Sequence, residues 1–145
     1  MAHNRRDVLA TLKTTLEEIA EITTVVRTYL STDFDITQYA QAELPLIVIP
    51  EPGEDTDQEC TSQMSMMVLE TNLKVYFLDW AIDPDETKFE ALVKKIRDKI
   101  GNNFTLSGTA EECRVADVSP VTGILPVYDF IIGLEMKYYL NELSV

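Results

Sequence analysis

From Val127 to Leu140, every second side chain is large and apolar. Successive side chains of an extended strand point to opposite faces, so these residues share one face of a strand. From Gly133 onward, the opposite face turns polar with Glu135 and Lys137. A typical strand has about 5–6 residues. This strand is therefore long enough to project beyond a compact domain or to pair with something outside it. Its apolar face carries Tyr128, Phe130, Ile132, Leu134, Met136, Tyr138 and Leu140.

A second long alternation covers residues 66–77. Glu70, Asn72 and Lys74 fall on its polar face, which is typical of a strand with one face against a core and one toward solvent. The other face is apolar, with Met67, Leu69, Leu73, Val75 and Phe77. The sequence therefore predicts two long strands, one in the middle of the chain and one near its end.

Two segments have apolar residues every three to four positions, which predicts amphipathic helices. The first is Arg6–Ile22, with Asn4 as its N-cap. The second begins at Asp83-Pro84-Asp85-Glu86, where the first aspartate caps the helix and the proline takes the first helical position. Gly101 ends it.

The remaining segments are shorter. Thr23–Leu30 and Cys113–Val121 are expected to be strands, and Asp33–Gln41 a short helical turn. Leu44–Ile49 is apolar on both faces, which suits a strand inside the sheet. Glu51–Gln63 carries five acidic residues around a glycine and is predicted to be a mobile acidic loop.

The order of these elements predicts an α+β fold. We expect a mixed, mostly antiparallel sheet of four to five strands, with the two main helices packed on one face. A chain of 145 residues is one domain by length. Residues 1–145 are therefore interpreted as a single domain.

Charge is the unusual feature of the composition. The chain has 12 basic and 25 acidic side chains, which gives a net charge of −13. Such a surface repels nucleic acid and anionic membranes. The longest purely apolar run lies around Leu44–Pro50 and is too short to span a membrane. The first residues do not resemble a secretory signal, so a cytoplasmic protein is expected.

Residues suited to catalysis are scarce. The one histidine, His3, lies at the terminus, so no histidine-based triad is expected, and the isolated glycines form no phosphate cradle. Cys60 and Cys113 are far apart in the sequence, which disfavours zinc and leaves free thiols or a disulfide open. Helix capping explains the best acidic cluster better than a metal does. We expect no catalytic, cofactor-binding or metal-binding residues. The acidic cluster that helix capping explains consists of Asp79, Asp83, Asp85 and Glu86.

The candidates for an interface or a lumen lie in the middle of the chain. Acidic residues of the 51–63 segment form either a solvated connection or an arm that contacts a neighbour or faces a pore. Two methionines at the start of the second long strand are either core filling or adaptable contact residues. The candidates are Glu51, Glu54, Asp55, Asp57, Glu59, Met64 and Met66.

The order of segments resembles the tail terminator family of long-tailed bacteriophages, the lambda-type minor tail protein U group. The resemblance covers most of the chain and is a pattern of segments, without a signature motif. It rests on the opening helix Arg6–Ile22, Leu44–Ile49 running into the acidic loop with Gly53, a long strand finishing near Tyr76–Leu78, the helix start at Asp83–Glu86 and the final strand Asp129–Tyr139.

The resemblance implies a structural protein of the virion tail, assembled in the cytoplasm of the bacterial host. Members of the tail terminator family form a homo-hexameric ring that caps the tail tube, stops tube polymerisation and provides the head–tail joining surface. The implied partners are the major tail tube protein and the head–tail connector protein, with no membrane. DNA would pass through the lumen without specific binding, and an acidic lumen would keep it from sticking.

Three alternatives remain open from the sequence. The chain could be another head–tail joining or tail completion protein. It could be a small metal-dependent or acid–base enzyme that uses Asp79, Asp83 and Asp85. A monomeric acidic adaptor is the third reading.

Overall fold

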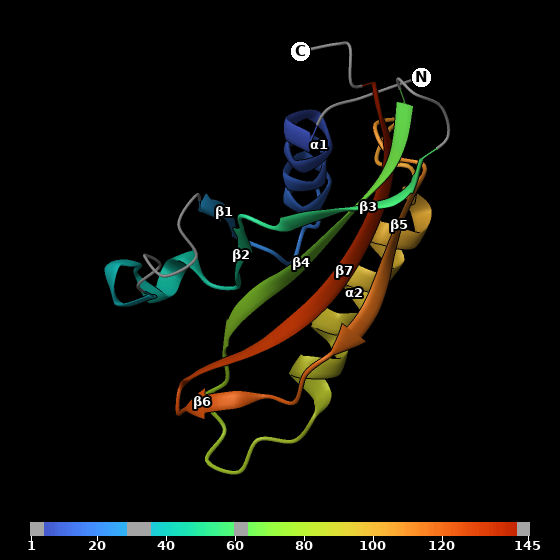
Figure 1. Ribbon diagram of the computed structural model, residues 1–145. Helices are drawn as coiled ribbons and strands as arrows, with labels where there is room; N and C mark the ends of the chain where they lie inside the picture. Colours follow the sequence, from blue (N-terminus) through green and yellow to red (C-terminus); the bar gives the residue numbers. More distant parts are fainter. Residues whose placement is uncertain (1–4, 29–35, 60–63, 142–145) are drawn as a thin grey trace.

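Two long antiparallel strands form the centre of the computed structural model, which describes residues 5–28, 36–59 and 64–141, with side chains for all of these except 53–59, 64 and 141. Strands β4 (Met64–Leu78) and β7 (Val127–Asn141) pair along their whole length (Figure 1). The long strand at the end of the chain therefore pairs along its whole length inside the domain. Period-two alternation cannot identify the partner of a strand.

The predicted faces of these two strands are confirmed. Leu69, Leu73 and Val75 on β4 are fully buried, as are Ile132 and Met136 on β7. Because paired residues of antiparallel strands point to the same side of the sheet, the two apolar rows merge into one floor of the core. Alternation in the sequence thus fixed which face of each strand is buried.

Shorter strands cover the outer edges of the two long ones. On β4, the edge is shared by β2 (Leu46–Pro50) and β3 (Gly53–Glu59), both antiparallel to it. On β7, the edge is shared by β5 (Glu112–Val118) and β6 (Thr122–Ile124).

Strand β1 (Thr24–Thr28) pairs with β2 in parallel. The order β1-β2-β4-β7-β5 gives five strands in a row, with β3 beside β4 and β6 beside β7. This is the mixed, mostly antiparallel sheet that the sequence predicted.

Strand β3 corrects the predicted mobile loop. Gly53–Glu59 pairs with β4 from Glu70 to Ser65, with an irregularity between Thr56 and Gln58. The acidic, glycine-containing composition is typical of a loop, but β2 pairs only with residues 74–76 of β4. The rest of that β4 edge has backbone groups that need hydrogen-bond partners, and β3 supplies them. Tertiary pairing therefore overrides the local preference.

Both helices pack on one face of the sheet, as predicted (Figure 1). Helix α1 (Arg5–Glu17) is shorter than expected. The backbone N–H groups of Glu18 and Ile19 donate to the carbonyl oxygens three residues earlier, so the α-helical hydrogen-bond pattern ends there. Ile19 and Ile22 nevertheless stay buried, since the turns keep both side chains toward the core. The expected N-cap, Asn4, lies outside the described residues.

Helix α2 (Thr87–Asn102) begins later than predicted. Its N-cap is Glu86, whose side chain makes no capping hydrogen bond, so the predicted cap at Asp83 was wrong. The side chain of Asp85, one residue before the cap, accepts a hydrogen bond from the backbone N–H of Thr87 at 3.0 Å. The helix continues through Gly101, whose surroundings leave room for an ordinary helical residue. The apolar stripe of this helix is confirmed, with Leu92, Ile96 and Ile100 buried.

Among the described residues, the opposite face of the sheet has a buried cluster near β1 and β2. A second, smaller cluster forms there around Leu44, Leu46, Val48 and Tyr76. Two short 3₁₀ turns, η1 (Ile36–Gln38) and η2 (Gln41–Glu43), lie in the segment that leads into it. The first matches the helical turn predicted for Asp33–Gln41, of which residues 33–35 lie outside the described part of the chain.

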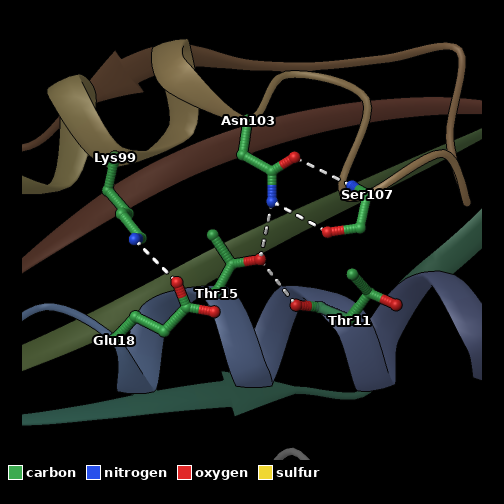
Figure 2. A network of polar contacts seen from close by, with 6 residues as sticks. All are labelled: Thr11, Thr15, Glu18, Lys99, Asn103 and Ser107. Carbon is green, nitrogen blue, oxygen red and sulfur yellow. Dashed lines mark hydrogen bonds and ion pairs between the residues drawn. The ribbon is translucent and has the colours of Figure 1, made fainter.

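A polar network joins the two helices (Figure 2). The amide nitrogen of Asn103, directly after α2, donates to the hydroxyl of Thr15 on α1 at 3.3 Å. Its amide oxygen accepts from the backbone N–H of Ser107 at 2.8 Å, which closes the turn after the helix. An ion pair between Lys99 and Glu18, at 2.8 Å, lies beside it. Asn103 therefore ties the end of α2 to both α1 and the following turn.

Gly133 provides a testable feature of the sheet. A Cβ atom at this position would lie 2.2 Å from Oδ1 of Asp117, which accepts a hydrogen bond from the Gly133 N–H at 3.1 Å. Asp117 on β5 lies directly across from Gly133, just after a β-bulge. The carboxylate therefore occupies the space that any side chain at position 133 would need.

We expect Gly133→Ala to lower the free energy of unfolding by about 1–2 kcal/mol, because it displaces Asp117 and breaks that hydrogen bond. In an Asp117→Ala background the same change should become stabilising by about 0.5 kcal/mol, since alanine is better than glycine inside a strand. Urea unfolding of the four proteins in this cycle measures the sign change. Additive effects would mean that the carboxylate is not the obstacle.

Candidate functional site

The predicted interface residues are placed in three different surroundings. Glu51 lies between β2 and β3 and forms an ion pair with Arg5 at the start of α1, at 2.5 Å. The same arginine also donates to the backbone oxygen of Pro52. Oε1 of Glu51 therefore links the β2–β3 junction to α1, while Oε2 is buried with no hydrogen-bond partner among the described residues.

The other four acidic candidates, Glu54, Asp55, Asp57 and Glu59, fall on strand β3. Their side chains lie outside what the structure describes. Among the described residues, β3 pairs only with β4, so its outer backbone edge is open. The structure thus places these four acids in sequence along one edge of the sheet.

The two methionine candidates begin strand β4. Met64 pairs in register with Asn141, and Met66 with Tyr139. Met66 is half-buried, while its neighbour Met67 points into the core. The alternation of β4 therefore puts Met66 on the sheet face away from the helices.

An exposed apolar surface, not predicted from the sequence, lies where β4 ends and β7 begins. Trp80 is 62% exposed and Ile82 94% exposed in the loop after β4. Ile124 is 84% exposed and Leu125 44% exposed in the turn between β6 and β7. The backbone N–H of Asp79 donates to the oxygen of Pro126 at 2.9 Å and joins the two segments. We call these four residues the apolar tip.

A cavity of about 180 Å³ opens next to the apolar tip. Its apolar walls come from both long strands and from α2, and its acidic rim comes from the loop before α2 and the end of β4. The rings of Phe77 and Tyr128, paired across β4 and β7, lie 6.0 Å apart between centroids. The lining residues are Phe77, Asp79, Pro84, Asp85, Glu86, Phe89, Val121 and Tyr128.

The acidic rim contains three of the four residues that the sequence suggested as a metal or acid–base cluster. Asp79 is buried, with 7% of its surface exposed, whereas Asp83 is exposed and does not line the cavity. Hydrogen bonds from the hydroxyl and the backbone N–H of Thr87 lower the pKa of Asp85. Within the described ranges, no three acidic, histidine or cysteine side chains are placed as a group that could hold a metal ion.

Of the two cysteines, Cys113 is a free thiol buried in the core. Burial, with a smaller effect of the neighbouring Glu112 charge, raises the pKa of Cys113 to about 12. The thiol is therefore protonated and unreactive at neutral pH. Cys60 lies outside the described residues.

Two further observations complete the description. Neither described helix is long and apolar enough to cross a membrane. Comparison of the chain with models of protein families and with curated proteins found no match.

Proposed function

We propose that the chain is a structural tail terminator of a long-tailed bacteriophage. In this role it assembles as a homo-hexameric ring on the end of the tail tube, stops further polymerisation and offers the surface that the head connector joins. The order of segments that resembles this family is the reason for choosing it among assembly proteins. The proposal includes no catalytic step.

The observation that carries the proposal is the apolar tip. Large apolar side chains gathered on a chain of net charge −13 are typical of a surface that another protein covers. Trp80 and Ile82 are far more exposed than is usual for such side chains. Subunits that contact head to tail through a surface of this kind close into a ring when the rotation between them is right.

The sheet also supports an assembly role, in a way that differs from the one expected from the sequence. The long strands are internal, so in the described part of the chain the open edges belong to β1, β3, β5 and β6. Charged residues on short edge strands hinder uncontrolled edge-to-edge pairing. In this proposal β3 lies toward the lumen, where its carboxylates repel passing DNA.

Electron microscopy and light scattering of the purified chain, alone and with polymerised tail tubes, test the proposal directly. We expect annular particles, or a monomer that forms rings on the tube ends. A strict monomer that ignores tubes would contradict the proposal and favour the adaptor reading.

Neutral amides at Glu54, Asp55, Asp57 and Glu59 should leave the free energy of unfolding within about 0.5 kcal/mol of the original, because the backbone pairing of β3 with β4 does not depend on the carboxylates. The same variant should impair ring assembly or DNA passage, because the acidic strand is neutralised. Chemical unfolding and infectivity in a complementation assay measure the two effects. A control variant removes four exposed charges elsewhere, at Glu43, Glu90, Glu111 and Glu112. Equal infectivity of the two variants would show that β3 has no special part in assembly.

A further inference from the structure

We propose that the cavity beside the apolar tip is a docking site for an arginine side chain of another protein, carried on a segment that also has apolar residues. This inference does not depend on ring formation. It follows from the size of the cavity, its charge, its aromatic walls and the state of the chain's own cations.

The size of the cavity limits what it can hold. At about 180 Å³ it is smaller than the roughly 300–1,000 Å³ of pockets that bind cofactors and drug-sized ligands. It is also several times larger than the roughly 30 Å³ that one water molecule takes up. One long side chain fits these limits.

The charge of the cavity selects a cation. Three carboxylates line it and no lysine or arginine does. Asp79 is the most telling of them, because its side chain is buried and only one of its oxygens, Oδ1, is hydrogen-bonded, to the N–H of Ala81 at 3.0 Å. The other oxygen has no hydrogen bond from any described residue. That oxygen is not among the fully buried atoms that lack a partner, so it is open to a donor that enters the cavity. A hydrogen bond to a charged group is stronger than one between neutral groups.

The aromatic walls favour a guanidinium over a metal ion or an ammonium. Phe77, Phe89 and Tyr128 present ring surfaces to the same space that the carboxylates border. A guanidinium stacks on aromatic rings and donates two hydrogen bonds to one carboxylate, and it sheds water more easily than an ammonium does. Asp79, Asp85 and Glu86 are not placed as a metal-binding group within the described chain.

The chain's own cations are largely engaged already. Lys94, Lys95 and Lys99 on α2 form ion pairs with acidic residues, and Lys88 donates to the backbone oxygen of Leu78. An excess of 13 negative charges makes a basic partner the complementary one. Since Trp80 and Ile82 of the apolar tip lie in the same loop as Asp79 and Glu86 of the cavity, the partner segment should bring apolar side chains next to its arginine.

Nuclear magnetic resonance titration with the blocked tripeptide acetyl-Leu-Arg-Leu-amide, at about 0.15 M salt to screen weak surface contacts, tests the inference. We expect saturable shifts confined to residues 77–89 and 121–128. The same peptide with citrulline, which is neutral and has nearly the shape of arginine, should bind at least tenfold more weakly. The lysine peptide should also bind more weakly than the arginine peptide.

Two variants of the chain complete the experiment. Asp79→Asn keeps an oxygen for the Ala81 N–H, so it should fold, and it should weaken arginine-peptide binding at least tenfold. Glu111→Gln removes one exposed charge from another part of the surface and should leave binding unchanged. Equal binding of the citrulline or lysine peptide, shifts spread over the acidic surface, or unchanged binding to a folded Asp79→Asn variant would each overturn the inference.

Discussion

Replacing Leu134 with aspartate is expected to abolish the folded state. Leu134 is 2% exposed and lies in the main core, across from Thr71 on β4 and Val115 on β5. Loss of the leucine side chain alone costs about 2–5 kcal/mol, and an unpaired buried carboxylate adds to that. The sum is comparable with the roughly 5–15 kcal/mol that holds a domain together. Circular dichroism and the urea midpoint of the purified variant measure the loss.

Ile131→Asp is the matched control on the same strand. Ile131 lies on the sheet face away from the helices, is 36% exposed and pairs in register with Lys74. Its backbone N–H donates to the hydroxyl of Ser119, a bond that does not depend on the side chain. We expect this change to cost about 1 kcal/mol, the range of strand propensities. A folded Leu134→Asp protein, or two variants of equal stability, would show that the helix-covered face is not the core.

The contrast between these two positions shows why much of the fold could be predicted from the sequence. Alternation along a strand is a local property, and it assigns Leu134 and Ile131 to opposite faces before any partner is known. Helical spacing did the same for the buried stripe of α2. Both patterns involve only residues close together in the sequence, so they can be recognised without knowledge of the tertiary structure.

The sequence could not predict features that depend on contacts with distant parts of the chain. The acidic segment 53–59 is a strand only because β4 leaves part of its edge unpaired beside β2. Helix α2 begins at Thr87, with Glu86 and not Asp83 as its N-cap, and the acids of this segment could not be told apart as caps by composition. Glu51 lies in a connection, as predicted, but its ion pair with Arg5, 46 positions earlier, could not be inferred from neighbouring residues.

The candidate site could not be predicted from the sequence for the same reason. The cavity depends on the register that sets Phe77 opposite Tyr128, and on the later start of α2, which leaves Asp85 and Glu86 outside the helix. The apolar tip depends on two turns that a single backbone bond joins. The clusters Trp80-Ala81-Ile82 and Ile124-Leu125 are visible in the sequence. Only the structure shows that they are exposed together.

Gly123→Ala should have the second large effect, because it acts on the turn that carries half of the apolar tip. Gly123 on β6 has a φ of +121°, a conformation that costs other residues about 1–3 kcal/mol. A Cβ atom would also lie 2.5 Å from the backbone oxygen of Val127, which cannot move aside without shifting β7. We expect a loss of about 2–4 kcal/mol in the free energy of unfolding. Urea unfolding measures it.

Gly101→Ala is the matched control, with the opposite expected sign. Gly101 lies within α2, and a Cβ there meets nothing within 4 Å, so alanine should stabilise the chain by about 0.5–1 kcal/mol. Val121 and Tyr128 flank Gly123 and line the cavity. A shifted turn should therefore also weaken binding of the arginine peptide, whereas Gly101→Ala should leave binding unchanged. If Gly123→Ala kept both its stability and its peptide binding, the backbone of this turn would not be what shapes the cavity.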